Sequence, residues 1–252
     1  MQERRLGVLA FGDSITNGGG ELQWGVALQS WAFWLARGLG LPFTSFATDG
    51  AGVTDVVAQQ LPACERRGDG PYDLGCLYVG VNDVRMLDWD PAAFARDYEA
   101  ALGFLTARCT RVLAVMIPLD LGRPRAGHTV QEANAAIERA ARAAGALVLD
   151  LRGFGARNLV MADHVHPTAF GQIAIAERAL DLLAADGLEP LVRPSSLIVY
   201  ETKRAGRLRG DLTYAYRHAK ITARAAALGA RASWDRRRAA RAGAARSDTR
   251  RR

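Results

Sequence analysis

The chain has 252 residues, of which 49% are hydrophobic and 23% are charged. This composition is typical of a globular protein with a substantial core, and it excludes a wholly disordered chain, a fibre and a small disulfide-stabilised fold. The net charge of +7 is unevenly distributed. Residues 1–200 hold 17 basic and 22 acidic side chains, a charge of −5, whereas residues 201–252 hold 16 basic and four acidic ones, a charge of +12.

The three cysteines cannot all pair with one another, so we expect reduced thiols. No apolar segment precedes the first strand-like run, and no apolar run approaches the roughly 18 residues of a membrane-spanning helix. We therefore expect a cytoplasmic protein.

Short apolar runs alternate with longer amphipathic stretches along the first 187 residues. The runs predict buried strands over residues 6–11, 42–47, 74–79, 111–117 and 146–151. The amphipathic stretches predict helices over residues 30–39, 54–62, 91–107, 129–144 and 168–186. Nearly continuous apolar strands separated by helices predict an α/β fold, in which helices cover both faces of a doubly wound parallel sheet.

Several helix boundaries are marked by capping residues. Thr54 and Thr168 are candidate N-caps, and Thr129 opens a sequence with the form of a capping box. Asp90 precedes Pro91, which is tolerated in the first helical position.

The chain divides into a body (residues 1–188), a proline-containing connector (189–210) and a basic Ala/Arg-rich tail (211–252). The tail has few large apolar residues, so we expect it to be helical or disordered rather than to form a core. Three roles remain open for it: an extension without a dedicated partner, contact with anionic lipid, and contact with nucleic acid.

Polar motifs follow the predicted strands, at the edge of a parallel sheet where active sites lie. Gly12-Asp13-Ser14 follows the first strand, and Gly50-Ala51-Gly52 follows the second. Gly80-Val81-Asn82-Asp83 follows the third strand, and Asp163-His164-Val165-His166 lies after the fifth.

These residue types suit acyl transfer. The Ser14 hydroxyl is a weak nucleophile until a base takes its proton, and the imidazole of His166 titrates in the right range to do so. Asp163 is close enough in sequence to accept the other ring N–H and fix the tautomer. Candidate donors to the oxyanion are the N–H groups of Ser14 and Gly52 and the side-chain amide of Asn82.

The four motifs, in this order, resemble those of the SGNH/GDSL hydrolases over about residues 6–185. Ser14 matches the nucleophile of the family's GDS motif, Asn82 matches the asparagine of GxND, and Asp163 with His166 matches DxxH. Gly52 fits the glycine of the second block. The resemblance implies a flavodoxin-like five-stranded sheet and hydrolysis of esters through a serine acyl-enzyme, without a metal or other cofactor.

One block departs from the family pattern. Where the family often has an asparagine, this chain reads Ala47-Thr48-Asp49-Gly50, so Gly50 remains an alternative to Gly52 in the oxyanion hole. Asp163, His164 and His166 could instead bind a metal ion, but no HExxH motif accompanies them.

The expected function is that of a serine esterase acting on a small or medium acyl ester, with acetyl esters as one candidate. Thioesterase and acyltransferase activities stay open, because the same scaffold serves all three. The candidate substrate-binding residues are Asp13, Arg85, Arg123 and Arg125. The arginines would contact an anionic group, or else are solvated loop charges. The alternative function is that of a non-catalytic binding or tethering protein that holds anionic partners through its tail.

Overall fold

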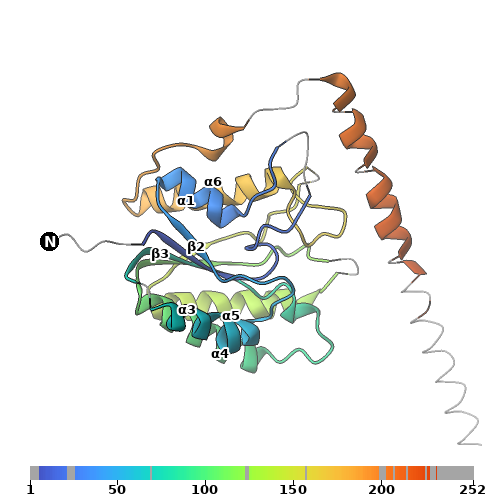
Figure 1. Cartoon of the computed structure of the whole chain (residues 1–252). Coiled ribbons are helices and arrows are strands. Elements are labelled where there is room, and N and C mark those ends of the chain that lie inside the picture. Colours follow the sequence, from blue (N-terminus) through green and yellow to red (C-terminus); the bar gives the residue numbers. More distant parts are fainter. Residues whose placement is uncertain are drawn as a thin grey trace, which may run out of the picture.

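The computed structural model describes residues 6–231 except 22–25, 69, 123–124, 157, 199–202, 207, 214, 225 and 228–230. Its centre is one sheet of five parallel strands in the order β2-β1-β3-β4-β5 (Figure 1). The strands are β1 (Val8–Gly12), β2 (Phe43–Ser45), β3 (Tyr72–Tyr78), β4 (Cys109–Val115) and β5 (Leu147–Leu149). All five predicted strands are confirmed, and the strand order is that of flavodoxin-like folds, with a switch point between β1 and β3.

Helices cover both faces of the sheet (Figure 1). On one face α1 (Trp31–Leu39) packs against α6 (Ala169–Ala185). On the other lie α3 (Leu61–Arg67), α4 (Pro91–Thr106) and α5 (His128–Ala144), with α4 and α5 in contact. β1 and β3 are almost entirely buried between these layers, which explains why their sequences are nearly all apolar.

Three helix starts follow the sequence pattern. The hydroxyl of Ser30 accepts the Ala32 N–H at the start of α1, and that of Thr168 accepts the Gly171 N–H at the start of α6. The Asp90 carboxylate accepts two N–H groups of the first turn of α4. Each cap satisfies amide groups that would otherwise lack a partner.

The predictions of Thr54 and Thr129 as N-caps are wrong. α2 (Val53–Asp55) begins after Gly52, because the Asp55 carboxylate accepts the Gly52 N–H and closes the turn there. The Thr54 hydroxyl instead donates to Asp97. α5 begins after Gly127, and the Thr129 hydroxyl donates to the carbonyl groups of Val84 and Ala126.

The predicted helix end at Pro62 is also wrong. A wide π-turn, η1 (Val56–Gln60), leads into α3, and Pro62 occupies the first turn of that helix. In a regular α-helix the proline ring would clash with the carbonyl four residues earlier, and the π-turn changes that spacing. The helix therefore continues to Arg67.

The connector returns along the body. The N–H groups of Leu191 and Val192 donate to the Gly38 carbonyl, and the short helix η3 (Pro194–Leu197) packs on α1 and α6. The described residues of 204–227 are helical, so helix begins inside the segment expected as connector. No described helix is long and apolar enough to cross a bilayer.

Candidate active site

The turn after β1 exposes Ser14 at the carboxyl edge of the sheet. Gly12 has a φ of 154°, and a Cβ at this position would collide with the Tyr78 carbonyl of the neighbouring strand. The Gln60 carboxamide accepts the Gly12 N–H at 3.0 Å and donates to the Gly12 carbonyl at 2.8 Å. The backbone of Gly12, two residues before Ser14, is therefore held by the Gln60 side chain and lies close to the Tyr78 carbonyl.

Ser14, His166 and Asp163 form a hydrogen-bonded relay. The Ser14 Oγ lies 2.9 Å from His166 Nε2, and His166 Nδ1 lies 2.7 Å from the Asp163 Oδ2. With the Nδ1 proton donated to the carboxylate, Nε2 is left to accept the serine proton. The His166 side chain is 30% exposed, so the relay is open to a substrate.

The loop holds the carboxylate in place and tunes both titrating groups. Asp163 Oδ1 accepts the N–H groups of Val165 at 2.9 Å and His166 at 3.1 Å. Burial would raise the pKa of Asp163, but these hydrogen bonds and the one from the imidazole hold that pKa below its usual value. The hydrogen bond to Asp163 raises the pKa of His166, in opposition to the effect of burial.

Gln172 joins the two ends of the body. From the first turn of α6, its carboxamide donates to the Ile15 carbonyl at 3.0 Å and to the Gly19 carbonyl at 2.9 Å, and it accepts the Trp31 N–H at 2.8 Å. Because α6 directly follows the loop that carries His166, these bonds fix the turn that carries Ser14 relative to His166.

Asn82 and Ser14, two of the expected oxyanion donors, each have an N–H hydrogen available for a further acceptor. Asn82 is half-buried, and its amide nitrogen donates one hydrogen to the Ala51 carbonyl at 3.0 Å, which leaves the second hydrogen for another acceptor. The Ser14 N–H has no acceptor among the described residues.

The Gly52 N–H has an acceptor that the sequence did not reveal. It donates to Asp55 Oδ2 at 2.9 Å, so it can serve an oxyanion only by sharing this hydrogen. A Cβ at position 52 would lie 2.9 Å from an Asp83 carboxylate oxygen, which explains a glycine there. Gly50 is exposed with a φ of 77°.

The prediction that Asp13 contacts substrate is wrong. Its side chain turns inward beneath Ser14, where it is fully buried and accepts the Ile15 N–H at 2.9 Å. Burial raises the pKa of Asp13 to about 7, although the Ile15 N–H and the nearby His166 lower it. Burial also raises the pKa of the neighbouring Asp83.

The three arginines occupy different settings. Arg85 is exposed in the short helix η2 (Asp83–Arg85) and lies close enough to His166 to lower the pKa of the imidazole. Arg125 is exposed and pairs with Asp120 at 2.8 Å. Arg123 lies outside the described residues.

His164 points away from the relay. It has a φ of 56°, and its Nδ1 lies 3.3 Å from the same Asp120 carboxylate that binds Arg125. His164 and His166 therefore have different partners and do not converge on one point. Within the described part of the chain, no group of three His, Cys, Asp or Glu side chains is arranged to hold a metal ion.

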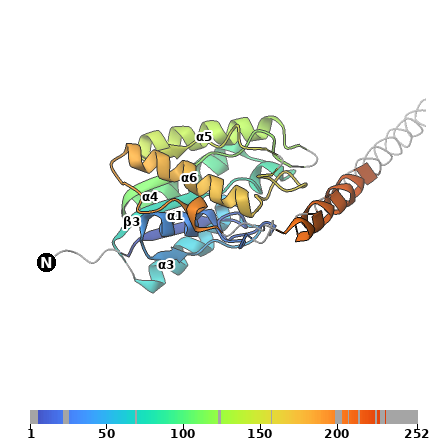
Figure 2. The same ribbon diagram turned by 90° about the horizontal axis from the view of Figure 1, so that it is seen from above.

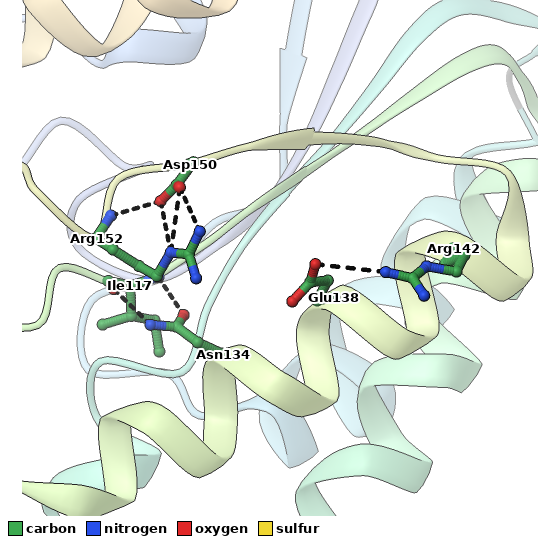
Figure 3. A network of polar contacts seen from close by, with 6 residues as sticks. All are labelled: Ile117, Asn134, Glu138, Arg142, Asp150 and Arg152. Carbon is green, nitrogen blue, oxygen red and sulfur yellow. Dashed lines mark hydrogen bonds and ion pairs between the residues drawn. The ribbon is translucent and has the colours of Figure 1, made fainter.

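Three buried carboxamides that support the site were not predicted as functional. Besides Gln60 and Gln172, Asn134 of α5 accepts the Ile117 N–H at 2.7 Å and donates to the Ile117 carbonyl at 2.8 Å (Figure 3). Asn134 thus holds the chain where it leaves β4. Its sequence signal is an amide on the apolar face of a helix, between Val130 and Ile137.

A comparison with known proteins identifies the family of the chain. Residues 10–173 match the model of the GDSL-like lipase/acylhydrolase family. The chain belongs to this family, and it is a carboxylic ester hydrolase. No curated protein sequence matches it.

Solved structures share the fold at low sequence identity. An alpha/beta hydrolase from the metagenome of Lake Arreo is 18% identical, with a TM-score of 0.57 over 71% of this chain and 94% of that one. A lipolytic G-D-S-L protein from Veillonella parvula is 21% identical, with a TM-score of 0.57 over 71% and 98%.

The acetylxylan esterase of Geobacillus stearothermophilus is 16% identical, with a TM-score of 0.57 over 70% of this chain and 93% of its own. Two further structures of that esterase are of catalytic mutants, one with a serine and one with an aspartate replaced by alanine.

Proposed function

We propose that the chain is a serine esterase that hydrolyses a small or medium acyl ester through an acyl-enzyme on Ser14. The observation that carries this proposal is the continuous relay of Ser14, His166 and Asp163, with heavy-atom distances of 2.9 and 2.7 Å. The catalytic serine and aspartate of the acetylxylan esterase are consistent with it, and they make acetyl esters the first substrates to test.

In the first half of the reaction, His166 takes the Ser14 proton while Oγ attacks the ester carbonyl. The proton then passes from the imidazolium to the departing alkoxide, which leaves an acyl-serine and an alcohol. In the second half, His166 takes a proton from water, and the resulting attack releases the acid and restores Ser14. Asp163 stabilises the imidazolium in both halves.

Each attack places negative charge on the former carbonyl oxygen. The Ser14 N–H and the second amide hydrogen of Asn82 are the donors we assign to that oxygen, with the Gly52 N–H shared between it and Asp55. We assign Arg85, which is close enough to His166 to lower the pKa of the imidazole, to an anionic part of the substrate.

The test is hydrolysis of p-nitrophenyl acetate by the parent protein and by Ser14→Ala. We expect kcat to fall by about 10³-fold or more, because the acyl-enzyme cannot form. A fluorophosphonate should label the parent and not the variant. The matched control is Ser196→Ala, which removes an exposed hydroxyl of the connector.

Control and parent should behave alike, and all three proteins should have the same Tm. Equal rates for the parent and Ser14→Ala would contradict the proposal and favour a tethering role. Rates with thioesters and with alcohol acceptors then separate hydrolysis of oxygen esters from thioester hydrolysis and acyl transfer.

A further inference from the structure

The helical stretch 204–227, here called the tail helix, presents an apolar stripe to solvent. Leu208, Leu212 and Tyr216 are spaced by four residues, so they lie on one face. They are 60%, 63% and 67% exposed. Together with Ala205 and Thr213 they line a shallow groove, and no described residue of the body lines it.

The tail helix is attached to the body by other residues. Arg217 pairs at 2.6 Å with Glu21, whose side chain is only 11% exposed. A different set of tail side chains, including Ala219 and Ala223, faces Val160 and His164 across a cavity of about 850 Å³. The stripe continues this face of the helix towards its N-terminal end, where no described residue of the body lines the groove.

The tail helix lies beside the carboxyl edge of the sheet, the edge that carries Ser14 (Figures 1 and 2). Other large apolar side chains are exposed at this edge. Met86 and Leu87 follow η2, and Leu119 lies in the loop after β4. Exposed apolar groups thus gather around the site as well as on the tail helix.

Charge indicates what covers the stripe. Residues 201–252 carry +12, against −5 for the rest of the chain. Arg209 and Lys220 are exposed on the tail helix beside the stripe. An anionic lipid surface offers phosphates to the cations and an acyl boundary to the leucines, whereas nucleic acid would engage the cations and leave the leucines in water.

We propose that the tail helix binds an anionic phospholipid surface, with Leu208, Leu212 and Tyr216 at the headgroup boundary and the basic side chains on the phosphates. Binding in this way would hold the esterase edge close to the bilayer. The proposal concerns the surface of the helix and does not depend on the esterase activity.

The test is co-sedimentation of the full chain with vesicles, either of phosphatidylcholine alone or of phosphatidylcholine mixed with phosphatidylglycerol. We expect the protein to be retained on the mixed vesicles only, with retention falling as salt is raised. Leu208→Ser/Leu212→Ser should weaken partitioning by about tenfold or more, because two leucines no longer leave water. Arg209→Gln/Lys220→Gln should weaken it by roughly fivefold per charge.

The matched control is Leu191→Ser/Leu197→Ser, which removes two exposed leucines of the connector. It should bind vesicles like the parent. Retention of the Leu208→Ser/Leu212→Ser protein equal to that of the parent would overturn the proposal. So would failure of the parent to bind mixed vesicles under conditions in which it is retained on duplex DNA. Tm measurements on every variant show whether the fold is retained.

Discussion

At the scale of single residues, the position of His166 is set by three hydrogen bonds and by the loop in which it lies. Its Nδ1 and its backbone N–H both bind Asp163, its Nε2 meets Ser14, and the loop that carries it leads into α6. Residues 163–172 thus hold the imidazole of His166, and Gln172 at the end of this segment reaches back to the turn that carries Ser14.

This geometry predicts the pH dependence of the esterase. His166 acts as a base only when neutral, and its hydrogen bond to Asp163 raises its pKa above the usual 6.5. We expect kcat/KM to rise with pH and to reach half its maximum above pH 6.5. In Asp163→Asn the carboxylate charge is lost, so that midpoint should move to lower pH while kcat falls by roughly 10³- to 10⁴-fold.

The measurement is a profile of kcat/KM against pH for both proteins, from about pH 5 to about pH 9, a range centred where imidazole titrates. An unchanged midpoint in Asp163→Asn would show that Asp163 does not control the titration of His166.

At the scale of elements, the first turn of α6 presses against the loop that leads to Asp163. A Cβ on Gly171 would collide with the Leu159 carbonyl, whereas a Cβ on Gly103, in α4, meets nothing. Both glycines lie in helices, so alanine improves intrinsic helix propensity at both positions.

The two substitutions should therefore have opposite effects. Gly103→Ala should stabilise the protein by roughly 0.5–1 kcal/mol. Gly171→Ala should lower Tm and kcat, because the Leu159 loop must shift and carries the catalytic loop with it. Thermal unfolding and kcat for the two variants test this, and a Gly171→Ala protein as stable and active as the parent would contradict the close approach.

The sequence predicted the elements better than it predicted their junctions. Five apolar runs are enough to identify five buried strands. The predictions of Thr54 and Thr129 as N-caps were wrong, because each helix begins two residues earlier, after Gly52, where the Asp55 carboxylate closes the turn, and after Gly127. The inward turn of Asp13 depends on the Ile15 N–H beneath Ser14, which is a feature of folded geometry and not of residue type.

In the site, too, some features follow from the sequence and others depend on contacts between distant residues. Ser14, Asn82, Asp163 and His166 follow strands whose ends meet at one edge, so topology brings them together. The carboxamides that hold the loops lie far from them in sequence: Gln60 is 48 residues from Gly12, and Gln172 is 157 residues from Ile15. A helical pattern shows that such a side chain is buried, but not which backbone groups it binds.

At the scale of the whole molecule, buried carboxyl groups link stability to pH. Asp13 has a pKa raised to about 7, so the folded protein keeps this proton over a range in which the unfolded chain loses it. Its contribution is most favourable below about pH 4 and is lost as pH rises towards 7. The raised pKa of Asp83 acts in the same direction.

Asp13→Asn, which resembles the neutral acid, should therefore raise Tm more at pH 8 than at pH 5, by at least about 4 °C. The control is Asp88→Asn, an exposed aspartate near the site, which should match the parent at both pH values. The measurement is thermal unfolding at the two pH values. An equal effect of Asp13→Asn at both would show that Asp13 is already ionised in the fold at pH 5.

The separation of Ser14 and His166 by 152 positions in the sequence has a consequence for biosynthesis. While the ribosome is still making the middle of the chain, the serine has no base beside it and the Gln172 contacts do not exist. By the proposed mechanism, a growing polypeptide would therefore be inactive towards acyl esters until α6 has left the exit tunnel and docked beside α1. Products shortened before residue 166 lack the base altogether, so this relay cannot form in them.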